Sequence, residues 1–532
     1  MNKIKEIYKN NFALIFAINV IVFTCLYLLV PCTYKQNDDV FMSWIASGVG
    51  MSDGLPNYHL LFINVILGYF ISFLYTISSN VEWYSLVIVI IQLLSYSCIH
   101  QHIVNSKKSR LLKVLFILLL FAFEVRIFVL LQFTTTAAMA AMAGIILILS
   151  NKRYENIIGL ILFIIASLLR FEAAMLVGCI SAPFILFFSR KFNYNFINYV
   201  FLGIIICSSV FLKSFDSYIY QSDSEWKELK EYNSIRGRIT DNPNFINFRS
   251  EDIDSSISMN DISFFEFLAL NSDILSVDVL REIKESIDGN TTFFQKITNV
   301  KDLLNGPIIM FFIFGTICLL LYLVVYEKIS YWKIITLVFY IFVLFVVISF
   351  ESRVKMRVFL SMMLPVWYFS SKLLSGDFTK RYIKLLLMSV FSYLIFGLFA
   401  YSIAGVYQSI KRKSVIEAQL SLINRQDPNC AIMPLGASLN VEFLPFMEIT
   451  NSIVPRIAIS HCYLPSPISK EVDNHIGFID SNIYLFANKN VALPRARLFQ
   501  KEFLEHYNLT TSVRIIDESE NFIIFNFIKN DK

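Results

Sequence analysis

The sequence predicts an all-α, multi-pass membrane protein with about eleven transmembrane helices and a small extracytoplasmic α+β domain at its C-terminus. Of the 532 residues, 56% are hydrophobic and only 16% are charged, whereas about a quarter of the residues in soluble globular proteins are charged. The mean hydropathy is +0.59. Apolar runs of about 20 residues recur, which is the length that a helix needs to cross a bilayer. This composition excludes a soluble enzyme and a disordered chain.

The first apolar run determines the predicted orientation. Lys3, Lys5 and Lys9 precede the run at 11–30, and basic residues favour the cytoplasmic side of a membrane. The N-terminus is therefore expected in the cytoplasm. The run has no small-residue cleavage site, so we interpret it as a retained anchor. Residues 31–81 then form an outer loop.

The segment 58–77 within this loop admits two interpretations. If it and the next run at 82–104 both cross the membrane, the basic residues at 107–113 lie outside, against the positive-inside rule. If it lies along the outer interface, those residues are cytoplasmic. Its polar and small side chains recur every four to five residues, which is typical of an interfacial helix and is also found in packed spanning helices. We favour the interfacial helix.

With that choice, the remaining runs alternate across the membrane and the C-terminus lies outside. Two basic groups, at 353–357 and 411–413, then oppose the positive-inside rule. The predicted spans lie near 11–30, 82–104, 111–131, 134–150, 156–170, 173–189, 196–212, 307–326, 332–350, 358–373 and 385–406.

Two polar regions are predicted outside the membrane. A second outer loop, 213–306, has short helical patches near 264–270 and 274–287. The membrane domain covers residues 1–412, and residues 413–532 form the C-terminal domain. That domain combines an amphipathic helix at 495–507 with strand-like runs at 431–435, 483–487, 512–516 and 522–528.

Ionisable residues beside the spans are candidate functional residues, because burying a charge in hydrocarbon is costly. On the predicted topology they gather on the outer side. The candidates are Asp38, Asp39, Arg126, Arg170, Glu172, Arg353, Lys355 and Arg357.

The acidic pair Asp38 and Asp39 precedes a helix-like stretch at 40–46. It is either a helix N-cap, accepting backbone N–H groups, or a general base at the membrane surface, with a pKa raised by partial burial and the second carboxylate. One Asp can cap the helix while the other acts as the base. No further carboxylate is placed to complete an octahedral metal site, so we expect neither a metal nor another cofactor.

The cations have comparable alternatives. The run 353–357 alternates basic with apolar residues. It is either an anion site for a lipid phosphate, to which Arg offers bidentate geometry, or a cytoplasmic anchor if the topology is inverted there. Arg170 and Glu172 are either part of that site or a local ion pair at a helix end. Arg126 lies within an apolar run, so it is expected to face other helices.

The order of these features along the chain is similar to that of a known family. One span is followed by an outer loop with Asn37-Asp38-Asp39, a proline-containing stretch with an interfacial helix at 56–77, and a span that opens Glu82-Trp83-Tyr84. This order resembles the GT-C superfamily of polyprenyl-phosphate-sugar-dependent glycosyltransferases. The stretch 353–365 is similar to the late-span Arg…Pro element of such enzymes. The chain looks most like the bacterial serotype-converting O-antigen glucosyltransferases, although 213–306 matches no family element.

The resemblance implies a GT-C-like fold and an inverting transfer. A sugar, expected to be glucosyl, would pass from a polyprenyl-phosphate carrier to a surface glycan such as lipid-linked O-antigen, on the periplasmic face of the bacterial inner membrane. The cations would hold the leaving phosphate, and Asp38 or Asp39 would deprotonate the acceptor hydroxyl. The implied partners are the lipid-linked donor, the glycan acceptor and membrane lipid, and no nucleic acid is expected.

Two other functions are weighed against this one. An O-antigen polymerase would have a similar number of spans and Arg residues for a lipid pyrophosphate, but it needs no acidic pair after the first span. A lipid-linked sugar flippase or transporter predicts charges along the mid-bilayer and a repeat between the two halves. In this sequence the charges gather on one face and no repeat is evident.

Overall fold

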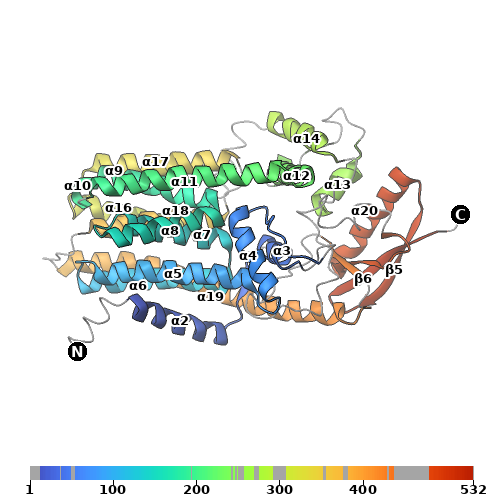
Figure 1. The fold of residues 1–532 in the computed structure, drawn as a ribbon, viewed down its shortest axis with the longest axis horizontal. Coiled ribbons are helices and arrows are strands. Elements are labelled where there is room, and N and C mark those ends of the chain that lie inside the picture. Colours follow the sequence, from blue (N-terminus) through green and yellow to red (C-terminus); the bar gives the residue numbers. More distant parts are fainter. Residues whose placement is uncertain are drawn as a thin grey trace.

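The structure is a computed structural model with a helical bundle at one end and a mixed region of helices and strands at the other (Figure 1). The predicted mainly helical chain with a small C-terminal sheet is confirmed. The described residues are 12–35, 37–48, 54–192, 194–240, 242, 244–245, 248–249, 257–268, 275–290, 307–351, 355–374, 381–427, 430–435 and 478–530.

Each of the predicted spans falls on a helix of the bundle. A single turn, α10 (Ser189–Phe192), follows α9. The bundle helices are α2 (Phe12–Leu29), α5 (Trp83–Asn105), α6 (Arg110–Val129), α7 (Phe133–Ile148), α8 (Arg153–Leu169), α9 (Phe171–Phe187), α11 (Phe196–Gln221), α16 (Pro307–Val325), α17 (Tyr331–Glu351), α18 (Met356–Leu373) and α19 (Arg381–Ile423).

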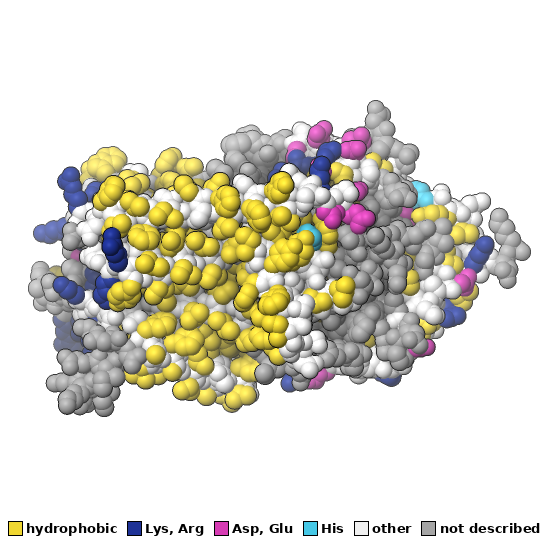
Figure 2. Space-filling model, in the orientation of Figure 1, with side chains coloured by type: hydrophobic (Ala, Val, Ile, Leu, Met, Phe, Trp, Pro, Cys, Tyr) yellow, Lys and Arg dark blue, Asp and Glu magenta, His cyan; other side chains and the backbone are white. Residues whose placement is uncertain are grey.

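The surface of the bundle is suited to lipid. On the face shown in Figure 2, hydrophobic side chains cover the bundle, while Lys and Arg gather at one end of it. Five of the described helices, α2, α5, α11, α16 and α19, are long and apolar enough to cross a membrane. The chain is therefore a multi-pass membrane protein by helix length and composition, and the number of eleven crossings stays a prediction.

Helix α7 lies at the centre of the bundle, with every residue from Phe133 to Ile148 buried. Its run of small side chains lets α8 approach closely. A Cβ added to Gly144 would lie 2.8 Å from the carbonyl oxygen of Gly159, and one added to Gly159 would lie 2.6 Å from the carbonyl oxygen of Gly144. This contact fixes the position of α7, whose first residue belongs to the site described below.

We expect Gly144→Ala to destabilise the bundle by about 1–3 kcal/mol, because the added methyl group meets backbone that cannot rotate away. The measurement is the apparent melting temperature of the purified protein in detergent. Gly203→Ala on α11 is the matched control, since its Cβ would meet no atom within 4 Å. Equal melting temperatures for the two variants would contradict the expectation.

The outer loop 31–81 begins and ends at one end of the bundle. The Tyr34 hydroxyl, just after α2, donates to Glu82 Oε1, just before α5, at 3.1 Å. Between them lie α3 (Asn37–Ser47) and α4 (Val65–Ile77), and we call this the α3 end. With 13 residues, α4 is about 20 Å long, too short for a hydrocarbon core of about 30 Å. The interfacial position of 58–77 stays a prediction.

A two-stranded parallel ladder holds the loop in place. The strand β1 (Thr33–Tyr34) pairs with β2 (Leu130–Leu131), which joins α6 to α7. The chain enters α3 beside the start of α7 as a result. Residues 97 positions apart are thereby neighbours before any side chain of the site is considered.

The segment after α11 forms helices at the α3 end (Figure 1). They are α12 (Ser224–Thr240), α13 (Met259–Leu268) and α14 (Val277–Asn290). Their apolar side chains, including Tyr232, Phe265 and Ile283, form a separate core. The predicted patches at 264–270 and 274–287 overlap α13 and α14, with 269–270 and 274 outside the described residues, whereas α12 was not predicted.

The C-terminal region is the predicted α+β unit. Its strands are β3 (Ala431–Pro434), β4 (Ile483–Asn488), β5 (Thr511–Glu518) and β6 (Phe522–Lys529), and its helix is α20 (Lys489–Tyr507). The sheet order is β3-β4-β6-β5, with β3 and β4 parallel and the other pairs antiparallel. The four strand-like runs are confirmed, and the helix begins six residues earlier than the expected 495. The predicted domain boundary at 412/413 lies within α19, which continues to Ile423.

Candidate active site at the α3 end

Asp39 connects α3 to the start of α7. Its side chain is 0% exposed, and its Oδ1 accepts hydrogen bonds from the Phe133 backbone N–H at 3.1 Å and the Tyr84 hydroxyl at 3.0 Å. A helix N-terminus offers unpaired N–H groups and a partial positive charge, both of which favour a carboxylate. Asp39 therefore caps α7. The predicted helix 40–46 begins earlier, at Asn37, so the acidic pair lies within its first turn.

The second oxygen of Asp39 is in a different position. Its Oδ2 is buried and has no hydrogen-bond partner among the described residues. Burial raises the pKa of Asp39 well above that of an exposed carboxyl, and the negative charge of Asp38 adds to the rise. The Phe133 N–H, the Tyr84 hydroxyl and the positive charge of Arg357 act in the opposite direction and are outweighed.

Asp38 is the accessible member of the pair. It is partly exposed, whereas Asp39 is enclosed. A general base must come within about 3 Å of the proton that it removes, so only the accessible carboxylate can meet a substrate without rearrangement. The structure thus gives the two adjacent acids different surroundings.

Arg357 is brought to this pair from the far side of the sequence. It lies in the first turn of α18, and its charge is close enough to lower the pKa of Asp39. Its Nη1 is buried and has no hydrogen-bond partner among the described residues. A buried guanidinium N–H without an acceptor costs about 1–3 kcal/mol or more. The site therefore presents a cationic donor that an incoming anion would satisfy.

Arg170 lies next to the same capped helix end. It occupies the junction of α8 and α9, and its guanidinium carbon is 5.4 Å from the ring centre of Phe62 and 5.7 Å from that of Phe133. Its Nε lies 3.0 Å from Glu172 Oε2, so the expected local ion pair is present. Glu172 also pairs with Lys213 on α11 at 3.1 Å. The Arg170 side chain is 28% exposed, which leaves it accessible to a ligand.

The other predicted cations are placed differently. Arg126 faces α19, as expected for a cation that packs against other helices. Its Nη1 donates to the Tyr401 carbonyl at 3.1 Å, and its guanidinium carbon lies 4.0 Å from the centre of the Tyr401 ring. Lys355 occupies the N-cap position of α18, two residues before Arg357. Arg353 lies outside the described residues.

A second buried carboxylate, Glu82, was not predicted to belong to the site. Its Oε1 accepts hydrogen bonds from Ser43 at 2.5 Å and from Tyr34 at 3.1 Å, and burial raises its pKa. The ring of Tyr34 meets that of Tyr84, the partner of Asp39, edge-on at 6.0 Å. The available sequence indication was an acid directly before an apolar span. Glu82 ties α3 to the start of α5 and so supports the acidic pair.

The start of α4 and the loop before it are held by the last turns of α11 and by α12. Asp216 Oδ1 accepts a hydrogen bond from the Val65 N–H at 3.0 Å, and its Oδ2 pairs with Lys230 of α12 at 2.8 Å. His59 stacks on Trp226 of α12 with ring centres 4.2 Å apart, and burial lowers its pKa to about 4. The beginning of 213–306 therefore braces the α3 end, a role that its polar sequence did not reveal.

Comparison with known proteins gives one structural similarity. No protein-family model matches the sequence, and no curated protein is significantly similar to it. The chain is similar to a solved structure, the crystal structure of ArnT from Cupriavidus metallidurans bound to undecaprenyl phosphate. The two sequences are 11% identical, the TM-score is 0.43, and the match covers 96% of this chain and 97% of that one.

Proposed function

We propose that the protein is an inverting glycosyltransferase that takes a sugar from a polyprenyl-phosphate carrier. The observation that supports this most directly is the unsatisfied Arg357 Nη1 beside an acidic pair at the end of a lipid-facing bundle. A lipid-linked phosphate would reach that point with its chain in the bilayer. A cation for the phosphate and a carboxylate for the acceptor then lie at the same depth.

In the proposed reaction, an acceptor hydroxyl attacks the anomeric carbon and the bond from that carbon to the phosphate oxygen breaks. Asp38 takes the hydroxyl proton. Arg357 donates to the departing phosphate, where negative charge develops, and Arg170, which lies beside the Phe133 ring at the start of α7, supplies a second cation. Attack opposite the leaving group inverts the anomeric centre, as in inverting glycosidases.

In this scheme Asp39 is a positioning residue and does not take the proton itself. Its hydrogen bond to α7 holds α3 against the bundle, which fixes the backbone that carries Asp38. Its enclosed carboxyl also keeps a negative charge near Arg357 whenever it is ionised. We further propose a glucosyl group as the sugar and a lipid-linked O-antigen on the periplasmic face of the inner membrane as the acceptor, with the α3 end periplasmic.

The test is mass spectrometry of surface glycan from a bacterial host expressing the chain. The reference is the double variant Asp38→Asn/Asp39→Asn, expressed in the membrane at the same abundance as the parent chain. We expect a hexose-sized addition with the parent chain and none with the variant. A collapse of glycan chain length at constant unit composition would instead support a polymerase. No change in either quantity would support a transporter.

A further inference from the structure

The polar segment after α11 and the C-terminal region meet through α13 and α20. The Asn260 side-chain amide donates to the Leu498 carbonyl at 3.2 Å, and the Ser258 hydroxyl donates to Glu505 Oε2 at 3.0 Å. These contacts join residues about 240 positions apart. Two units that lie outside the bundle are therefore docked onto each other.

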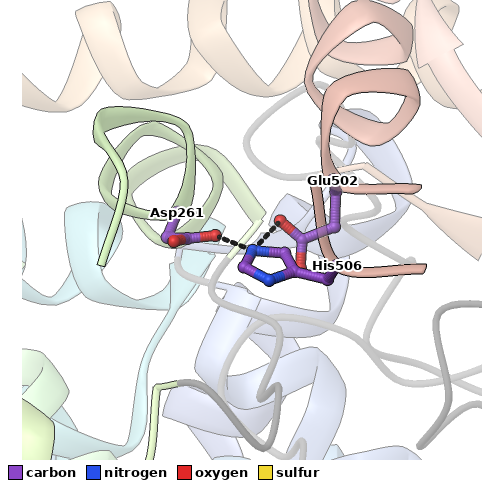
Figure 3. Close-up of side chains that lie close together, drawn as sticks. All are labelled: Asp261, Glu502 and His506. Atoms are coloured by element: carbon purple, nitrogen blue, oxygen red, sulfur yellow. Dashed lines mark hydrogen bonds and ion pairs between the residues drawn. The ribbon is translucent and has the colours of Figure 1, made fainter. Parts of the chain in front are cut away.

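Three potential metal ligands lie within this contact (Figure 3). Asp261 comes from α13, and Glu502 and His506 come from successive turns of α20. His506 Nε2 lies 2.9 Å from Asp261 Oδ1 and 3.8 Å from Glu502 Oε2. The three ligand atoms all lie within 4.8 Å of one another.

The charges of this group favour a cation. The side chains of Asp261 and Glu502 are 2% and 1% exposed, and burying a carboxylate is costly unless its charge is compensated. A divalent ion would balance both carboxylates while His506 binds it as a neutral imidazole.

The spacing also fits a small ion. Zn²⁺ bonds to His nitrogen and carboxylate oxygen are about 2.0–2.2 Å long, which places the donors of a tetrahedral site about 3.3 Å apart. The two distances from His506 Nε2, 2.9 and 3.8 Å, lie on either side of that value. The Ser258 N–H donates to Asp261 Oδ2 at 2.8 Å, which leaves Oδ1 directed toward His506. Such an outer hydrogen bond is typical of a ligating carboxylate.

We propose that Asp261, Glu502 and His506 form a binding site for a divalent transition metal of the Zn²⁺ class, which links α13 to α20. Imidazole together with two carboxylates selects such an ion over Mg²⁺, which takes oxygen ligands in an octahedron. The ion holds α13 against the helix of the C-terminal region. This site is separate from the acidic pair of α3.

The test uses the full-length protein in detergent, purified without a polyhistidine tag and stripped with chelator. Zn²⁺ is returned by dialysis and counted by elemental mass spectrometry, and its affinity is measured by competition with a chromophoric chelator. We expect one tightly held Zn²⁺ per chain. Glu502→Gln and His506→Gln should each weaken binding by at least about 100-fold, because loss of an outer-shell partner alone costs about 10–100-fold.

Glu520→Gln is the control, because it removes an exposed carboxylate between β5 and β6 that lies outside the trio and outside the contact of α13 with α20. It should keep the affinity of the parent chain. A parent chain that retains no Zn²⁺ would overturn the proposal, whatever the variants do. Unchanged affinity in both ligand variants would overturn it as well. In a parallel assay, Zn²⁺ should protect the stripped parent from proteolysis within α13, and protection that persists in His506→Gln would contradict the proposed link between α13 and α20.

Discussion

Replacing Asp38 by Asn is expected to lower the rate of sugar transfer by about 10²–10⁴-fold, the usual contribution of a general base. Asn keeps the size of the side chain but cannot accept the proton of the attacking hydroxyl. Donor binding should change little, because the phosphate is held by cations. The measurement is kcat and KM for a polyprenyl-phosphate sugar, with purified protein in detergent.

Asp39→Asn provides the informative comparison. The Asn carbonyl oxygen can still accept from the Phe133 N–H and the Tyr84 hydroxyl, so the cap on α7 survives and activity should fall far less than in Asp38→Asn. Asp39→Ala removes the cap, at a cost of about 0.5–2 kcal/mol of stability. If Asp39→Asn were the inactive variant and Asp38→Asn the active one, the base would be Asp39 and our assignment would be wrong.

Arg357→Gln is expected to reduce kcat/KM by about 10²–10³-fold, the effect of removing one preorganised donor to a developing anion. Gln keeps hydrogen-bonding groups but loses the charge, so donor binding should weaken as well. Arg357→Lys should give an intermediate result, since a point charge replaces a bidentate fork. The measurements are steady-state kinetics and direct binding of polyprenyl phosphate.

The control for Arg357 is Arg190→Gln, an exposed cation of α10 at the opposite end of the bundle. It should leave both quantities unchanged. Parent-like binding of polyprenyl phosphate by Arg357→Gln would show that this guanidinium does not hold the lipid phosphate. A loss of equal size in the Arg190 variant would point to a general effect of charge on the membrane protein.

The apolar helices of the bundle could be predicted because contact with lipid determines their composition. The residues at which they end could not be predicted as well. The sequence placed the end of one span at 212 and another at 406, whereas α11 continues to Gln221 and α19 to Ile423. Hydropathy reports where the chain leaves the apolar environment, and a helix can continue beyond that point. The polar helix α12 was missed because its buried side chains, such as Trp226 and Leu229, are few among many charged ones.

The sequence identified the charged residues that are candidates for the site, because charges beside apolar spans are costly, but it did not show which of them lie together. Asp39 was identified because two acids follow an apolar run, but its partner is the backbone N–H of Phe133, which no side-chain pattern reveals. Arg126 is as unusual in its sequence as Arg357, yet it contacts Tyr401 of α19. Only the packing of distant helices distinguishes a cation that has partners from one with an unsatisfied donor.

The 43-residue helix α19 is a continuous, rigid connection between the bundle and the C-terminal region. At a rise of 1.5 Å per residue it is about 65 Å long, roughly twice the thickness of a hydrocarbon core. Ser409 donates to the Pro31 carbonyl at 2.6 Å and Arg412 to the Tyr34 carbonyl at 3.3 Å, so α19 is held, about two-thirds of the way along its length, beside the chain that leads into α3. Because each residue adds about 100° of rotation, the helix between Ser409 and Ile423 sets both the height of the C-terminal sheet and the direction in which it faces.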